Sequence, residues 1–186
     1  TMTVNPNVAA SVSIAASPST TICSGTNVTF TATPTNGGTT PAYQWKKNGV
    51  NVGTNSTTYS ENALTNGNTI TCTMTSNAAC VTGSPAVSNT LTMTVNSTPT
   101  VTGFSPGNGT VGTSVVITGT NFSAVTQVQF NITNASFTIN NSTQITATVP
   151  AGATTGTIKV TNACGTGTSV SSFTVNSTPV TFTLKV

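Results

Sequence analysis

The sequence has almost no charged residues. Its 186 residues include no histidine, and charged side chains make up 3% of the chain, against about 25% in ordinary soluble domains. The charged residues are Lys46, Lys47, Glu61, Lys159 and Lys185. General acid–base catalysis needs groups that titrate near neutral pH, and glycoside hydrolysis needs a pair of carboxylates. One glutamate cannot supply these groups, so we expect no enzymatic activity and assign no catalytic residue.

The same shortage of charge limits what the chain can bind. Calcium sites use several carboxylates, and zinc sites use clusters of His, Cys or acidic side chains. We therefore expect neither a metal site nor a cofactor. Nucleic-acid binding needs clustered Lys and Arg, whereas only Lys46 and Lys47 are adjacent here. No run of 18 apolar residues is present, so we expect no nucleic-acid partner and no membrane insertion.

The chain is instead rich in Thr, Asn, Ser, Gly and Val. Its β-branched residues recur at every second position, for example in residues 28–32 and 69–75, with clusters of Gly, Pro and Asn between such runs. Low charge with polar tracts can indicate disorder, but this alternation is typical of β-strands. Short strands at this spacing predict an all-β chain of two tandem immunoglobulin-like β-sandwiches.

A repeated junction predicts the domain boundaries. The first five residues, Thr-Met-Thr-Val-Asn, recur at 92–96, and the linker Asn-Ser-Thr-Pro of residues 96–99 recurs at 176–179. A strand that ends in Val-Asn, followed by small polar residues and a proline, is how one β-domain ends and the next begins. We predict the end of a preceding domain at 1–6, domains at 7–96 and 97–178, and the start of a following domain at 179–186. The chain is then a piece of a long tandem protein.

An aromatic pair marks the core of the first domain. Tyr43-Gln44-Trp45 has one aromatic on each side of a glutamine, and the Asn48-Gly49 pair that follows is a strong hairpin signal. We expect Trp45 to be a core anchor rather than a platform for ligand stacking, because an immunoglobulin-like core needs a large ring at this point. The four cysteines, Cys23, Cys72, Cys80 and Cys164, allow three complete pairings.

Three segments of the first domain carry a family resemblance. Residues 22–38 (ICSGTNVTFTATPTNGG), 43–45 (YQW) and 75–80 (TSNAAC) resemble the immunoglobulin-like/PKD-like repeats of large Bacteroidota cell-surface proteins. The resemblance implies an extracellular, secreted repeat of adhesins and gliding-associated proteins, which are often exported by the type IX system. It also implies a disulfide between Cys23 and Cys80, which leaves Cys72 and Cys164 free or otherwise paired.

The second domain resembles a different family. Residues 104–122 (FSPGNGTVGTSVVITGTNF) and 143–161 (TQITATVPAGATTGTIKVT) resemble IPT/TIG domains. In this pattern Val115 and Ile117 point into a core, and Gly119 precedes a bend that inserts Phe122. The resemblance implies an immunoglobulin-like sandwich that acts as a spacer or a protein-binding module. Relatives that bind DNA use Arg and Lys loops, which this sequence lacks.

Two functions from different classes fit these observations. The leading hypothesis is a non-catalytic structural repeat of a surface adhesin or filament, which spaces or presents an adhesive region. Its partners would be neighbouring domains of the same chain and like chains in a filament. The alternative is a recognition module for a glycan or another polymer, which needs an exposed aromatic platform with polar partners. The aromatic candidates for this role are Tyr59, Phe137 and Phe182. A weaker alternative is ice binding through Thr-x-Thr ladders. Ordinary outward-facing strand threonines already explain that pattern.

Overall fold

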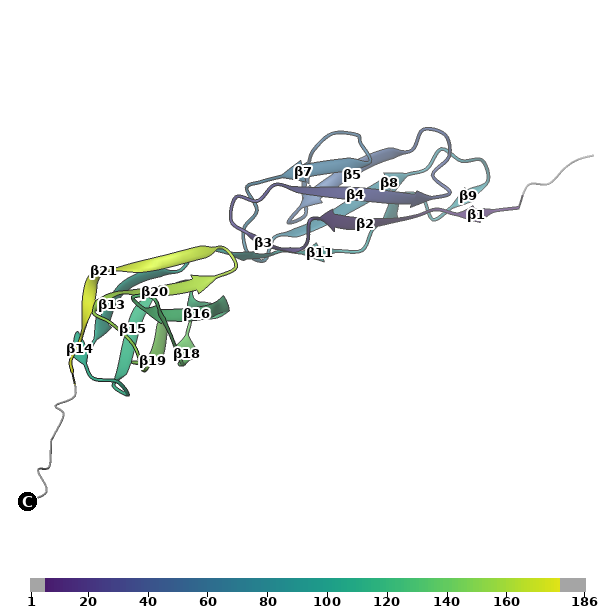
Figure 1. Cartoon of the computed structure of the whole chain (residues 1–186). Coiled ribbons are helices and arrows are strands. Elements are labelled where there is room, and N and C mark those ends of the chain that lie inside the picture. The colour runs from purple at the N-terminus through teal and green to yellow at the C-terminus, as the bar shows by residue number, and fades with distance from the viewer. Residues whose placement is uncertain (1–5, 178–186) are drawn as a thin grey trace, which may run out of the picture. The chain divides into compact units, whose positions relative to one another are not determined.

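The computed structural model describes residues 6–177, which form β-strands joined by turns (Figure 1). Within that range the one helical element is a short 3-10 turn, η1 (Phe122–Ala124). The chain divides into two compact units, residues 1–95 and 96–186. The predicted start of a following domain at 179–186, and nearly all of the predicted segment 1–6, lie outside the described residues. Each unit is an immunoglobulin-like β-sandwich and is described by itself.

The first sandwich has two main layers. One sheet has the strand order β2-β4-β7, and the other has the order β10-β8-β5-β6 with β11 also paired to β8. Two short pairs, β1 with β9 and β3 with β12, lie beside these layers. The strands are β1 (Val8–Ala9), β2 (Ser11–Ser17), β3 (Thr21–Cys23), β4 (Val28–Thr35), β5 (Ala42–Lys47), β6 (Val50–Val52), β7 (Thr58–Glu61), β8 (Thr69–Thr75), β9 (Val81–Thr82), β10 (Ala86–Val87), β11 (Leu91–Thr92) and β12 (Thr94–Asn96).

Alternation along the strands builds the core of this sandwich. β2 and β4 pair antiparallel without a break, from Ser11 opposite Thr35 to Ser17 opposite Thr29. Successive side chains point to opposite faces of a strand, so Val12 and Ile14 are buried while Ser11 and Ser13 are exposed. In the opposite sheet, buried residues also occupy alternate positions along β5 and β8. The inner faces of the two sheets therefore bury each other.

Trp45 lies at the centre of this core and is fully buried. The rings of Phe30 and Tyr59 lie 6.4 Å and 6.0 Å from its indole ring, centroid to centroid. The indole Nε1–H donates a hydrogen bond to the carbonyl oxygen of Ser56 at 2.9 Å. A buried indole needs such a partner for its one polar group. Its position in the core leaves no face for a ligand.

The cysteines differ from the prediction. Cys80 is a free, exposed thiol, and it lies in the turn between β8 and β9, where its carbonyl oxygen accepts a hydrogen bond from the backbone of Val8. Cys23 ends β3, which pairs with β12 at the other end of the same sandwich (Figure 1). A disulfide requires Cα atoms within about 7 Å, so the predicted Cys23–Cys80 bridge is wrong. Cys23 and Cys164 are each disulfide-bonded, and Cys72 is a buried free thiol.

The second sandwich also has two sheets. Their strand orders are β13-β15-β19-β18 and β14-β21-β20-β16-β17. The second and last strands of this sandwich form a parallel pair, because β14 joins β21 in the second of these sheets. The strands are β13 (Thr100–Ser105), β14 (Asn108–Gly109), β15 (Ser114–Thr120), β16 (Val125–Phe130), β17 (Thr133–Ala135), β18 (Phe137–Asn141), β19 (Gln144–Thr148), β20 (Gly156–Asn162) and β21 (Gly165–Val175).

Three aromatic rings fill part of the second core. Phe122, Phe130 and Phe173 are fully buried, and the rings of Phe130 and Phe173 meet edge to face at 5.0 Å between centroids. Gly119 lies where any Cβ would overlap both the Thr100 carbonyl oxygen and the ring of Phe122. Glycine at this position therefore allows the first strand and the buried ring to approach β15 closely.

We expect Trp45→Ala to destabilise the first sandwich by roughly 3 to 5 kcal/mol, because it removes a large ring from a close-packed site. The second sandwich should unfold as before. Chemical denaturation with one spectroscopic signal from each domain measures both effects. Val50→Ala is the control, because Val50 is 68% exposed and its loss should change stability little. An unchanged midpoint for Trp45→Ala would show that the indole adds nothing to the core.

The two free thiols, Cys72 and Cys80, should be alkylated at different rates. Cys80 is exposed and should be alkylated quickly in the folded protein. Burial raises the pKa of Cys72 to about 11, and the thiolate is the reactive form, so Cys72 should react only on unfolding. Mass spectrometry after timed alkylation without reductant measures this order. Protection of Cys80, or equal rates for both thiols, would contradict the structure.

Candidate functional site

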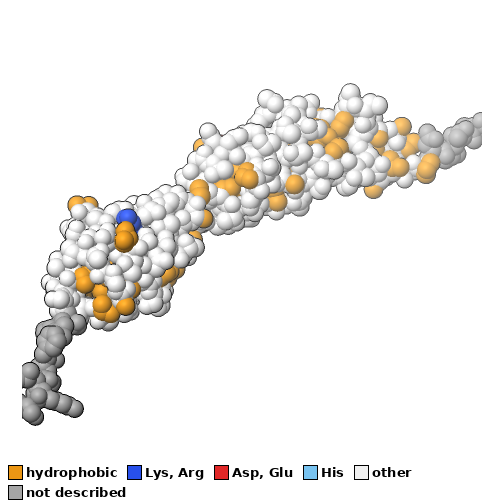
Figure 2. Space-filling view, viewed as in Figure 1, with side chains coloured by type: hydrophobic (Ala, Val, Ile, Leu, Met, Phe, Trp, Pro, Cys, Tyr) orange, Lys and Arg blue, Asp and Glu red, His pale blue; other side chains and the backbone are white. Residues whose placement is uncertain are grey.

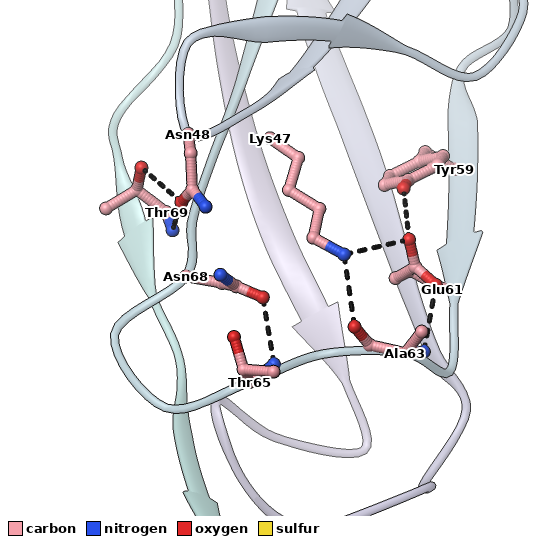
Figure 3. Close-up of polar contacts among 8 residues, drawn as sticks. All are labelled: Lys47, Asn48, Tyr59, Glu61, Ala63, Thr65, Asn68 and Thr69. Carbon is pink, nitrogen blue, oxygen red and sulfur yellow. Dashed lines mark hydrogen bonds and ion pairs between the residues drawn. The ribbon is translucent and has the colours of Figure 1, made fainter.

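The single ion pair of the described residues belongs to a polar cluster in the first sandwich (Figure 3). Glu61 Oε2 accepts hydrogen bonds from Lys47 Nζ at 3.2 Å and from the Tyr59 hydroxyl at 2.9 Å. Its Oε1 accepts from the backbone N–H of Ala63 at 2.9 Å, and Lys47 also donates to the Ala63 carbonyl oxygen at 3.1 Å. Each member of the cluster is hydrogen-bonded to another member, so the cluster holds the end of β7 and the loop after it.

These contacts change how the cluster titrates. The hydrogen bond from the Ala63 backbone, aided by those from Tyr59 and Lys47, lowers the pKa of the Glu61 carboxyl despite partial burial. Burial, together with the bond to Glu61, raises the pKa of Tyr59 to about 12. Glu61 is therefore ionised and Tyr59 neutral at pH 7. Neither group is poised to exchange protons near neutral pH, as acid–base catalysis would require.

The aromatic candidates for ligand stacking do not form a platform. Tyr59 stacks on Phe30 at 5.9 Å between ring centroids, and its hydroxyl is bound to Glu61. Phe137 is partly buried against the second core, and Phe182 lies outside the described residues. Within residues 6–177 the exposed large hydrophobic side chains are all aliphatic: Val50, Val87, Val111, Ile132 and Val170. On the face that Figure 2 shows, most of the described surface is backbone or uncharged polar side chains, and the hydrophobic side chains form small groups.

The second sandwich has a groove of about 310 Å³ between β13 and β21. Residues 102–104 form one wall, residues 169–172 form the other, and Gly107 lies at one end. These two strands belong to different sheets and face each other across an open edge of the sandwich. The lining contains no charged side chain. Because it combines hydroxyl groups with apolar atoms, the groove is our candidate functional site.

Both walls of the groove are β-bulges. On β13, Thr102 is the extra residue between the pairs Val101–Gly119 and Gly103–Thr118. On β21, three residues, 169–171, lie opposite Ile158 alone, and β21 bends along its length in Figure 1. Bulges bend a strand and redirect side chains, and they are frequent at sheet edges and next to active sites. The two irregularities together separate the strands and open the groove.

Ser169 satisfies the hydrogen bonds of the larger bulge. It is 5% exposed, and its hydroxyl accepts from the Ile158 backbone N–H at 2.9 Å while it donates to the Ser171 carbonyl oxygen at 2.6 Å. Val170, the next residue, is 99% exposed. The buried serine therefore turns the valine outward to the rim of the groove.

Three other hydroxyls line the groove without such internal partners. The side chains of Thr102, Ser171 and Ser172 form no hydrogen bond with one another or with any other described residue. Each is exposed and can both donate and accept. Phe104 is half-buried between them, with its ring 6.2 Å from that of Phe173. Sequence patterns did not single out this site, because strand serines and threonines are common throughout the chain.

The two-sheet arrangement defines each unit as an immunoglobulin-like β-sandwich. Residues 99–184 match the IPT/TIG domain family, so the second sandwich is an IPT/TIG domain. No curated protein matches the chain.

Several solved structures are similar to the chain. An auxiliary nutrient-binding protein from Bacteroides ovatus is 25% identical to this chain. The match covers 42% of this chain and 21% of that protein, with a TM-score of 0.40. SGBP-B from a complex xyloglucan utilization locus in Bacteroides uniformis is 17% identical over 87% of this chain and 48% of SGBP-B, with a TM-score of 0.43. Three N-terminal domains of the bacteriophage RB49 outer capsid protein Hoc are 16% identical over 89% of this chain and 59% of the Hoc chain, with a TM-score of 0.47. The chain thus spans about a fifth to three fifths of these proteins.

Residues 6–177 show neither a metal cluster nor a membrane-spanning helix. In this range no three His, Cys, Asp or Glu side chains lie close enough together to hold a metal ion. No helix in the same range is long and apolar enough to cross a membrane.

We expect Glu61→Gln to destabilise the first sandwich by about 1 to 2 kcal/mol at pH 7, because hydrogen bonds to a charged group are lost. The lowered pKa of Glu61 means that its contribution is complete above the unfolded-state value of about 4.3 and disappears as pH falls through the folded-state value. Denaturation of both proteins between pH 2 and 7 measures the difference, with Lys159→Gln as a charge control. A difference that is equal at every pH would exclude the carboxylate as its source.

Proposed function

We propose that this chain is a non-catalytic recognition module of an extracellular cell-surface protein, and that it binds an uncharged polymer such as a neutral glycan. The observation that supports the proposal most is the groove of the IPT/TIG domain. Three of its four lining hydroxyls, those of Thr102, Ser171 and Ser172, lack hydrogen-bond partners among the described residues, and apart from Ser169 its remaining lining is apolar or backbone. Ligand sites commonly combine an apolar surface with a few hydrogen-bonding groups.

The chemistry of the groove favours a neutral ligand. An anionic ligand would leave its charge without a basic partner, because Lys159 is the one charged residue of the second sandwich within the described range and it does not line the groove. Taking a charge out of water without pairing is unfavourable. Sugar hydroxyls, in contrast, match serine and threonine hydroxyls as both donors and acceptors.

The cysteines and the first domain support an extracellular location. Disulfides persist mainly in oxidising compartments, and Cys23 and Cys164 are each disulfide-bonded. The resemblance of the first domain to repeats of Bacteroidota surface proteins agrees with this location and with export by the type IX system. Adhesion or gliding would then be the activity of the longer protein that carries these domains.

A second candidate function is spacing within a tandem array. In the first sandwich the chain enters where the Val8 backbone N–H donates a hydrogen bond to the Cys80 carbonyl oxygen, and it leaves beside β3, at the other end. In the second, the Thr98 hydroxyl donates a hydrogen bond to the Cys164 carbonyl oxygen at the entry. At the exit, beyond the opposite end of β21, the Asn176 backbone N–H donates to the Gly109 carbonyl oxygen. Entry and exit at opposite ends suit each domain to a head-to-tail chain.

We expect the 186-residue protein to bind soluble neutral polysaccharides and not the anionic polygalacturonate. Affinity electrophoresis with a β-glucan, a galactomannan and polygalacturonate measures this preference, and isothermal titration with oligosaccharides of the retained polymer gives the affinity. Heat-unfolded, alkylated protein is the control. Equal retardation by all three polymers would indicate non-specific contact. Retardation by none of them would overturn the recognition proposal and leave spacing as the function.

A further inference from the structure

We propose that the groove between β13 and β21 is a subsite for one pyranose unit of a neutral glycan. Thr102, Ser171 and Ser172 would bind the sugar hydroxyls, while Phe104 and Val170 would contact the C–H face of the ring. This inference rests on the recognition function proposed above and names the site and ligand class for it.

The size of the groove sets the extent of the contact. Its volume of about 310 Å³ lies at the lower end of the range for ligand sites, roughly 300 to 1,000 Å³. A space of this size accommodates one ring rather than a long segment of polymer. Neighbouring units of the same glycan would extend over the open rim, where Val170 is fully exposed.

The two walls carry complementary groups. Thr102 comes from the bulge of β13, whereas Ser171 and Ser172 come from the bulge of β21 and the residue after it. Hydroxyls on both sides can therefore reach one ring from opposite edges. The ring of Phe104 is held in place by Phe173, at an interplanar angle of 57°, so its accessible part is a fixed apolar surface rather than a mobile one.

The same bulges disfavour an extended peptide as the occupant. Strand addition needs a row of unpaired backbone groups along a sheet edge, and bulges interrupt such rows. Here the Ser171 carbonyl oxygen already accepts the hydroxyl of Ser169, and the Gly107 carbonyl oxygen accepts the backbone N–H of Thr174. The side-chain hydroxyls remain available instead, which favours a ligand that bonds to side chains.

The test compares groove variants with matched surface variants of the full chain. One variant combines Thr102→Val, Ser171→Ala and Ser172→Ala, which removes the three hydroxyls with little change in shape. A second, Val170→Lys, changes the rim at a position that is 99% exposed. The controls are Thr138→Val, another exposed strand threonine, and Ile132→Lys, another exposed aliphatic residue. Thermal unfolding checks that all four variants fold.

Binding is measured by titration with β-1,4-linked gluco- and manno-oligosaccharides, with amide shifts in NMR spectra to locate the contact. We expect the triple variant to weaken binding at least tenfold, since each net hydrogen bond contributes roughly a two- to tenfold factor. Val170→Lys should weaken binding by a smaller factor, and the controls should bind as the parent chain does. Shifts should be concentrated in residues 102–107 and 169–172.

Three results would overturn the assignment in different ways. If the parent chain binds these oligosaccharides and the groove variants bind equally well, the subsite is elsewhere and the recognition function stands. If the parent chain binds neither these oligosaccharides nor the neutral polysaccharides, the recognition function fails together with the subsite. Shifts in the groove on adding an extended peptide, with none on adding sugar, would reject the glycan in favour of strand addition.

Discussion

Burial of alternate side chains between two facing sheets is the interaction on which both domains depend. The described residues contain a single ion pair, and salt bridges at such partly exposed positions contribute little. The fold is instead held by the inner faces of the strands, with Trp45 at the centre of one core and Phe122, Phe130 and Phe173 in the other. No buried side-chain polar atom in the described range lacks a hydrogen-bond partner. Hydrophobic burial and complete polar satisfaction therefore replace charge in this chain.

Much of the fold could be predicted from the sequence, because strand alternation and turn chemistry are local signals. The strand at 69–75 is β8, and the Asn48-Gly49 pair forms the β5–β6 hairpin with φ of 52° and 80°. The all-β fold is confirmed, and the IPT/TIG resemblance of the second domain is confirmed by the family match. In each case a few neighbouring residues determine the backbone, so distant contacts were not needed to predict it.

The cysteine pairing and the groove could not be predicted in this way. Cys80 lies in a turn with a φ of 55°, at the opposite end of the sandwich from Cys23, and only the strand order shows that separation. The groove depends on two bulges in strands that are 60 to 70 positions apart in the chain. A bulge leaves little trace in a sequence where serine occupies both exposed and buried positions. Ser169 is an example, because it is buried where its hydroxyl accepts a hydrogen bond from the β20 backbone. Its residue type alone does not predict that burial.

The larger bulge also constrains how this strand can change in length during evolution. Between its flanking pairs, β21 has three residues where β20 has one, so the bulge adds two residues, an even number. Gly167 before it and Phe173 after it therefore both face the core. Loss of a single residue would turn Phe173 outward, because side chains alternate along a strand. Loss of two would straighten the strand and keep its core face. Among related domains, insertions and deletions here should come in pairs, and a pairwise deletion would close the groove while leaving the sandwich intact.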